Sequence, residues 1–160
     1  ALEMPDLFAV IPAATDLLAD LISESIGSRR IFLVRGKSQQ VLAAADTVLL
    51  ASGTAALEST LTGRPSVAAY RLHPWTYRMV KSRLKSKFIT LPNFMANQAL
   101  IPELIQNEVT VENLVNHLRE PLKAGASLEF ISEAKRIHES LSGPVTERAV
   151  EFISEVIGCA

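Results

Sequence analysis

The sequence predicts an α/β domain with a mainly parallel sheet, helices on both faces of that sheet and an all-helical C-terminal extension. From residue 7 to residue 91, short apolar runs alternate with helix-forming segments, and this alternation is typical of parallel strands joined by crossover helices. Beyond residue 101, only amphipathic helix patterns remain. We therefore expect residues 1–160 to form one domain, with a sheet portion at 7–91 and a helical extension at 101–160.

Glycine and proline residues set the limits of most of the predicted elements. The apolar runs predict five strands of one sheet, at residues 7–11, 31–34, 47–51, 66–70 and 88–91. Periodic apolar residues between them predict helices at 13–26, 37–45, 52–61 and 73–84. The extension is predicted to hold helices at 101–107, after Thr110, at 127–140 and at 145–157. In the last of these, Phe152, Ile153 and Val156 share an apolar face that we expect to pack inward.

Residues 46–58 form the stretch around which the rest of the chain is organised. A buried strand runs through the small turn Ser52, Gly53 and Thr54 directly into a helix, with Ser52 or Thr54 as its N-cap. A helix N-terminus at the carboxyl end of a parallel strand offers N–H groups to an anion, above all to phosphate. Glu58 lies about one turn inside the helix, within reach of sugar hydroxyls. The alternative is an ordinary capped helix, because a Ser-Gly-Thr sequence is a weak motif.

A second polar residue follows the fifth predicted strand. Asn93 comes directly after Pro92, and ligands of open α/β sheets bind at the carboxyl ends of the strands. Its amide would then point a donor and an acceptor into the crevice beside Ser52, Gly53 and Thr54. The alternative is a plain Asn turn.

The charges of the chain are unevenly distributed, although the net charge is only −1. Residues 59–102 hold no acidic residue. They hold seven basic ones: Arg64, Arg71, Arg78, Lys81, Arg83, Lys85 and Lys87. Such a block attracts anions, and its interleaved aromatic residues suit the headgroup level of a phosphate-rich membrane. Nucleic acid and a solvated helix face are the alternatives, and the apolar content of 48% favours lipid.

Several other classes of protein are disfavoured by the composition. No run of about 18 apolar residues suggests a membrane-spanning helix, and the first residues lack the features of a signal peptide. We therefore expect a cytosolic chain, unless an upstream part is missing. The single cysteine, Cys159, excludes an internal disulfide and a cysteine metal cluster. No common catalytic or nucleotide-binding signature is present. The start without Met indicates a piece of a longer chain.

Four motifs together resemble those of the bacterial lipid-A-disaccharide synthase family. They are residues 51–58 (ASGTAALE), 69–71 (AYR) followed by Pro74 and Thr76, 91–93 (LPN) and 101–106 (IPELIQ). They occur in the order and spacing of the family's C-terminal half, and the likeness covers about residues 7–123. One departure is the sequence Ala96-Asn97-Gln98, where the family usually has Ala-Gly followed by a basic residue; a cationic contact from this loop is therefore not expected.

The resemblance implies the C-terminal, nucleotide-binding domain of a GT-B glycosyltransferase, a Rossmann-like domain. The family transfers a diacylated glucosamine from its UDP carrier to a lipid monosaccharide 1-phosphate, with inversion and without a metal or other cofactor. The product is the lipid A disaccharide 1-phosphate of lipopolysaccharide biosynthesis. The implied UDP-binding residues are Ser52, Gly53, Thr54, Glu58 and Asn93, the last in a supporting role. The general base is expected in an N-terminal acceptor domain that is absent from these residues.

The implied partners are UDP-diacylglucosamine, the lipid acceptor and an anionic membrane surface, but no nucleic acid; a homo-oligomer is left open. The residues expected to face lipid or phosphate are Arg71, Arg78, Lys81, Arg83 and Lys85. The implied location is cytoplasmic, peripheral on the inner face of the inner membrane, and the chain alone is expected to be inactive. The alternative from another class of function is a non-catalytic or regulatory α/β module that binds a phosphate ligand.

Overall fold

Five parallel strands form the centre of the computed structural model, which describes residues 4–27, 30–51, 53–83 and 86–158. Strands β1 (Ala9–Ala13) and β2 (Ile31–Arg35) pair in one sheet. Strands β3 (Val48–Leu50), β4 (Ser66–Tyr70) and β5 (Glu103–Ile105) form another, in that order. The α/β class and the parallel pairing are confirmed. The prediction of a single five-stranded sheet is wrong for the described residues, because β1 and β3 are not paired with each other.

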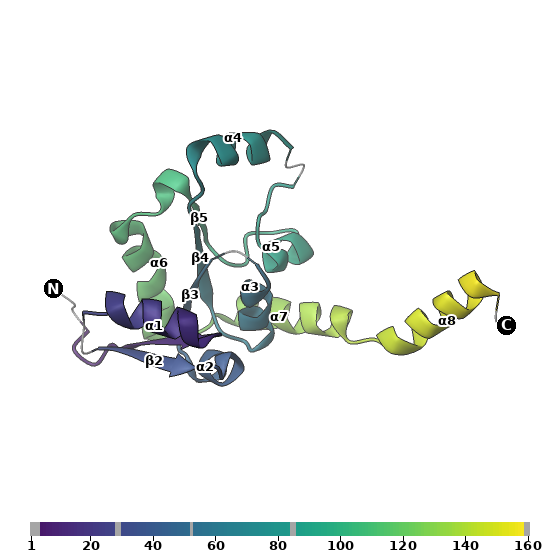
Figure 1. The fold of residues 1–160 in the computed structure, drawn as a ribbon, viewed down its shortest axis with the longest axis horizontal. Coiled ribbons are helices and arrows are strands. Elements are labelled where there is room, and N and C mark those ends of the chain that lie inside the picture. The colour runs from purple at the N-terminus through teal and green to yellow at the C-terminus, as the bar shows by residue number, and fades with distance from the viewer. Residues whose placement is uncertain (1–3, 28–29, 52, 84–85, 159–160) are drawn as a thin grey trace.

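Helices connect the strands and continue beyond them. They are α1 (Asp16–Ser25), α2 (Ser38–Ala44), α3 (Thr54–Leu61), α4 (Pro74–Arg83), α5 (Leu91–Ala96), α6 (Val111–Ala124), α7 (Leu128–Leu141), α8 (Val145–Ile157) and the 3₁₀ turn η1 (Gln106–Glu108). Side-chain oxygens of Thr15, Thr110 and Ser127 cap α1, α6 and α7, each accepting from the N–H three residues on. Figure 1 shows α3, α5 and α7 on one side of the three-stranded sheet and α6 on the other.

The segment from residue 88 to residue 107 differs from its prediction. The expected strand at 88–91 does not form: residues 88–90 have no regular structure, and Leu91 begins α5. The expected helix at 101–107 contains strand β5. Pro92 in the first turn of α5 suits a helix start. The Glu103 carboxylate accepts hydrogen bonds from the N–H groups of Ile89 and Thr90, which ties the segment before α5 to β5. The sheet portion therefore extends to residue 105 rather than ending at 91.

A small apolar core joins the three-stranded sheet to the first part of the helical extension. Its buried members are Ala56, Ala68, Ile101, Phe130 and Ala134. They come from α3, β4, the segment before β5 and α7. Because α7 supplies two of them, this helix belongs to the core of the domain.

The last helix behaves differently from its prediction. In α8, Phe152, Ile153 and Val156 are 66%, 55% and 68% exposed. The expectation that they pack inward is therefore wrong, and Figure 1 shows α8 reaching away from the body of the domain. Amphipathic periodicity predicts the helix and its apolar face, but it does not specify the surface that covers that face.

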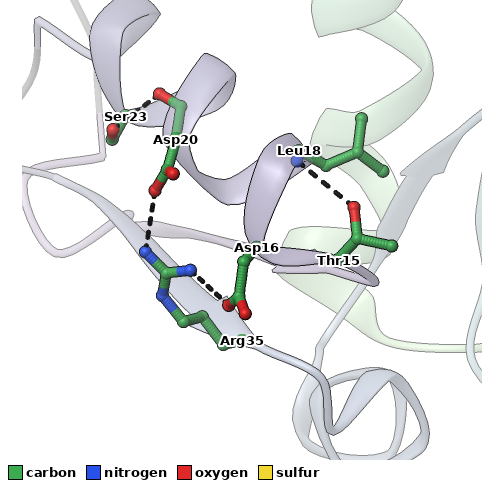
Figure 2. Close-up of polar contacts among 6 residues, drawn as sticks. All are labelled: Thr15, Asp16, Leu18, Asp20, Ser23 and Arg35. Atoms are coloured by element: carbon green, nitrogen blue, oxygen red, sulfur yellow. Dashed lines mark hydrogen bonds and ion pairs between the residues drawn. The ribbon is translucent and has the colours of Figure 1, made fainter.

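An ion-pair network attaches α1 to the end of β2. Figure 2 shows the guanidinium of Arg35 between the carboxylates of Asp16 and Asp20, with N–O distances of 2.5 and 2.9 Å. These hydrogen bonds, first that to Asp20 and then that to Asp16, raise the pKa of Arg35 above its usual value. A guanidinium is charged at neutral pH in any setting, so this exposed network links α1 to the end of β2 and adds modestly to stability.

Candidate functional site at the start of α3

The turn between β3 and α3 has the geometry of an exposed helix start. Gly53 is the N-cap of α3, with φ 132° and ψ −158°, a conformation that essentially only glycine adopts. Gly53 has no side-chain oxygen, so it cannot cap the helix as Ser52 or Thr54 was expected to do. Gly53 and Thr54 are both exposed. The N–H groups of the first turn thus lie at an accessible surface where a helix dipole favours an anion.

Helix α3 presents Glu58 one turn beyond Thr54. Residues four apart lie on the same face of a helix, and both of these are exposed. The opposite side of α3 is buried through Ala56, Ser59 and Thr60. The structure therefore brings Gly53, Thr54 and Glu58 together on one accessible surface. Ser52 lies outside the described residues.

Asn93 occupies a different environment from this surface. It lies in α5, is 1% exposed, and its amide is used within the protein. Its Nδ2 donates to the Ile101 carbonyl oxygen and to the Glu103 carboxylate, each at 2.9 Å, and its Oδ1 accepts from the Ile101 N–H at 2.8 Å. Sequence reasoning placed this amide in an open crevice, whereas the structure uses it to join α5 to the segment before β5.

Glu103 is the centre of the same polar cluster. One carboxylate oxygen accepts from the N–H and the hydroxyl of Thr90, at 2.8 and 2.7 Å, as well as from Asn93. Thr90 is fully buried. Sequence analysis missed this role because it placed Glu103 in a helix, where an acidic residue is ordinarily a solvated one. An acidic residue inside an apolar run was the available signal.

The carboxyl ends of β4 and β5 are held together by side chains. The Gln106 amide forms a pair of hydrogen bonds with the backbone of Leu72, at 2.6 and 3.0 Å. The guanidinium of Arg71 donates to the carbonyl oxygen of Val109 at 2.8 Å. These contacts fix the loop that follows β4, at the same edge of the sheet as the start of α3. Gln106 belongs to the 101–106 motif, but its contact with Leu72 cannot be read from local sequence.

The predicted lipid-facing residues are only partly described. Arg71 and Arg78 are exposed, as is Trp75, at 77%. Lys81 and Arg83 lie within the bounds of α4, but their side chains are not described, and Lys85 lies outside the described residues. Of the helices that the structure describes, none combines the length and apolar character needed to cross a bilayer. In the same residues, no three His, Cys, Asp or Glu side chains are placed to hold a metal ion.

A shallow groove of about 420 Å³ lies at the other end of α3. Thr60, Leu61 and Gly63 line it from the end of that helix, and Ile131, Lys135 and His138 line it from α7. It is thus separate from the surface formed by Gly53, Thr54 and Glu58.

Comparison with known proteins assigns this arrangement to a family. The family model described as lipid-A-disaccharide synthetase matches residues 6–156. The chain belongs to the lipid-A-disaccharide synthetase family. The matched residues include the whole start of α3, Asn93 and the 101–106 motif, which confirms the resemblance drawn from the four motifs.

Individual relatives agree with the family model. Proteins named lipid-A-disaccharide synthase are 39% identical over 160 residues in Azotobacter vinelandii, 37% over 153 in Pseudomonas putida and 36% over 161 in Alcanivorax borkumensis. These matches cover 98%, 94% and 96% of the chain, but only 42%, 40% and 41% of the relatives. The chain thus spans about two fifths of the length of these family members.

Proposed function

We propose that these residues are the donor-binding part of an inverting glycosyltransferase of lipid A biosynthesis. The observation that carries the proposal is the exposed start of α3, where Gly53 and Thr54 follow a parallel strand in a chain of this family. The donor would be UDP-2,3-diacylglucosamine, and the acceptor a lipid monosaccharide 1-phosphate. The product would be the lipid A disaccharide 1-phosphate.

The diphosphate of UDP would bind at the N–H groups of Ser52, Gly53 and Thr54. Charge develops on UDP as it leaves the sugar, and fixed N–H donors at a helix start stabilise such charge without reorganising. The stretch from 59 to 102, with seven basic residues and no acidic one, supports an anion-binding role for this part of the chain. In this proposal the protein's N–H groups take the place of a metal cofactor.

Glu58 would accept hydrogen bonds from the ribose hydroxyls, the role that an acidic residue has in dinucleotide sites. Its exposure and its position one turn beyond Thr54 support this role. Asn93 would support the site indirectly, by helping to hold α3 in place. Its buried amide links α5 to the segment before β5, and α5 contacts α3. A direct contact of Asn93 with UDP, which the sequence also predicted, stays a prediction.

In this proposal, the general base and the acceptor site lie in a separate N-terminal domain. We therefore expect the 160 residues alone to be inactive, and the full-length protein to be required for transfer. Titration of the full-length protein with UDP, followed by calorimetry and by the NMR shifts of backbone amides, tests the donor site. The largest shifts should occur at Gly53 and Thr54, and the amides of α8 should not shift. Saturable binding that leaves Gly53 and Thr54 unchanged would contradict the proposed site.

The exposed part of α4 is proposed to contact an anionic membrane surface, on the cytoplasmic side of the inner membrane. Trp75 is 77% and Met79 55% exposed, and Arg78 is exposed beside them. An exposed aromatic ring next to a basic residue matches the interface of an anionic bilayer, where the ring sits at headgroup depth. Such contact would bring the site close to lipid substrates without a membrane-spanning helix.

A further inference from the structure

Gln106, directly after β5, has an unusual backbone conformation and an unusual side-chain contact. Its φ of +54° lies in the left-handed region, which is unfavourable for a residue with a long side chain and which often marks a functional position. Its side-chain amide binds both backbone groups of one residue. Oε1 accepts from the N–H of Leu72 at 2.6 Å, and Nε2 donates to the carbonyl oxygen of Leu72 at 3.0 Å. An unfavourable conformation is thus maintained at a residue whose side chain holds another part of the chain.

This amide pair continues the β4–β5 ladder beyond the end of the strands. Backbone pairing ends with Tyr70 opposite Ile105, and the main chain turns into η1 at Gln106. Within a ladder, the N–H and carbonyl of a residue bond to the backbone of the neighbouring strand. At Leu72, the Gln106 amide takes the place of that backbone. Leu72 is therefore held at the edge of the sheet after β5 has ended.

A second polar side chain from the same strand holds the chain where it returns from α4. The Glu103 carboxylate accepts from the N–H groups of Ile89 and Thr90, so Glu103 and Gln106 fix the two ends of the segment that carries α4. Among the helices and strands that the structure describes, α4 is not one of those that pack extensively on another. Figure 1 shows α4 beyond the ends of β4 and β5. Its position therefore depends largely on these two attachments.

The connection between the amide pair and α4 is short and stiff. Only His73 separates Leu72 from Pro74, the first residue of α4. Proline has a fixed φ and restricts the residue before it, and the His73 carbonyl oxygen already accepts from the N–H of Tyr77 at 3.0 Å. Few backbone torsions remain free between Leu72 and the helix, so loss of the amide pair displaces α4 as a whole.

Helix α4 starts farther out from the sheet than the proposed diphosphate site. β3 and β4 are neighbours, with Leu50 opposite Ala68, but β4 continues to Tyr70. At about 3.3 Å per residue, the end of β4 lies about 7 Å beyond the end of β3. α3 and α4 each begin at the fourth residue after their strand, at Thr54 and Pro74. A ligand bound at the start of α3 can therefore reach α4 with a part that lies farther from the sheet.

Helix α4 offers that part of a ligand an apolar surface with one cation. Trp75, Arg78 and Met79 have the i, i+3, i+4 spacing of a single helix face, and all three are exposed. Such a face suits the acyl chains and phosphate groups of a lipid. A nucleotide alone has no acyl chains, so this face can distinguish an acylated ligand from UDP.

We propose that Gln106 is a positioning residue for the lipid part of the donor. Through Leu72 it holds α4 where Trp75 and Met79 receive the acyl chains of a UDP-sugar whose diphosphate lies at the start of α3. The helix face that meets the bilayer thus also receives the lipid from it. This role rests on the donor site proposed above, and it separates recognition of the acyl chains, by α4, from recognition of UDP, by α3.

Steady-state kinetics of the full-length protein test this role with Gln106→Gly. The change removes the amide and also the backbone strain, because glycine accepts a positive φ, so the variant should fold. The KM for UDP-diacylglucosamine should rise at least about tenfold with kcat nearly unchanged, whereas the Kd of UDP from calorimetry should stay within about twofold. Gln40→Ala, at an exposed glutamine of α2, should change none of these. An unchanged KM in Gln106→Gly, or an equal loss of UDP affinity, would overturn the proposal.

Amide hydrogen exchange of the same protein tests the amide pair itself. The N–H of Leu72 should exchange at least about 100-fold more slowly than an unstructured amide, and at least about tenfold faster in Gln106→Gly than in the unaltered protein. The N–H of Tyr77, bonded within α4, should not change. Exchange of Leu72 at the unstructured rate in the unaltered protein would overturn the proposal.

The NMR shifts caused by UDP distinguish failure of this role from failure of the donor site. UDP binding without shifts at Gly53 and Thr54 would contradict the donor site and the role that rests on it. Shifts at both amides together with an unchanged KM in Gln106→Gly would contradict only the role of Gln106.

Discussion

Gly53 combines a backbone conformation available to glycine with a position at the exposed start of α3. A Cβ at residue 53 would meet nothing within 4 Å, so Gly53→Ala costs backbone strain without a clash inside the domain, about 1–3 kcal/mol. The added methyl group would stand where the diphosphate is proposed to approach the N–H groups. We therefore expect Gly53→Ala to weaken UDP binding at least about tenfold, as measured by calorimetry on the folded protein.

Gly63 at the other end of α3 supplies the matched control for this change. It also has a positive φ, +70°, and open space at its Cβ position. Gly63→Ala should cost comparable stability and leave UDP affinity unchanged. Equal losses of affinity in the two variants would mean that strain in α3, rather than a blocked site, explains the effect.

Glu58 offers a test of the orientation of the nucleotide. Glu58→Gln keeps the shape of the side chain but removes the charge that strengthens its hydrogen bonds to hydroxyl groups. UDP affinity should fall by about three- to tenfold, in line with about 1 kcal/mol for one charge-assisted hydrogen bond. Titration with 2′-deoxy-UDP should show a smaller effect of the same substitution. An identical effect on both nucleotides would mean that Glu58 does not bind the 2′-hydroxyl.

Glu103 tests the polar cluster beneath α5. Glu103→Ala leaves the N–H and hydroxyl of buried Thr90 and one donor of Asn93 without their acceptor. We expect a loss of about 3 kcal/mol in the free energy of unfolding, since buried unsatisfied donors each cost about 1–3 kcal/mol. Glu103→Gln retains one acceptor oxygen and should cost less. Chemical denaturation measures both, and a loss within experimental error for Glu103→Ala would contradict a structural role.

At the scale of elements, the sequence predicts best where local signals act alone. β4 and α8 have the bounds that the sequence predicted. Each begins directly after a proline, Pro65 or Pro144, and ends where its apolar pattern ends. The region 88–107 was mispredicted because its conformation depends on contacts distant in the chain. Gln106 binds the backbone of Leu72, 34 residues away, and no local propensity contains that contact.

Helix α4 is the element whose predicted membrane contact can be tested directly. Arg78→Glu should reduce pelleting with anionic vesicles by about tenfold or more at low salt, because each basic residue near such a surface contributes about 1 kcal/mol. Reversal of Lys81, Arg83 and Lys85 as well should abolish it. Binding should also weaken as salt rises, as screening of exposed charges requires.

The control for this experiment is Arg148→Glu in α8, which makes the same change of charge at another exposed residue. It should leave vesicle binding nearly unchanged if α4 forms the contact. Similar losses of vesicle binding in the Arg78 and Arg148 variants would indicate a response to net charge alone. Vesicle binding that none of these changes affects would contradict a contact between α4 and the membrane.

At the scale of the whole molecule, the sequence predicted parallel strands and placed four of them correctly, but it predicted neither β5 nor the division of the strands into two sheets. Alternation of strands and helices determines the class of fold, whereas the pairing of one strand with another depends on contacts that local sequence does not contain. Similarly, residue types predicted that Gly53, Thr54 and Glu58 would lie together, because a single strand–turn–helix unit contains all three. The burial of Asn93 depends on Ile101 and Glu103 and was not visible at that level.

The metal requirement of the complete reaction is the corresponding test of the whole protein. If the N–H groups at the start of α3 stabilise the charge that develops on UDP, then treatment with EDTA should leave both UDP affinity and the rate of disaccharide formation unchanged. The measurement uses the full-length protein with UDP-diacylglucosamine and the lipid acceptor. Loss of either property on chelation, with recovery on adding Mg²⁺ or Mn²⁺, would show that a cation rather than the helix start neutralises the diphosphate.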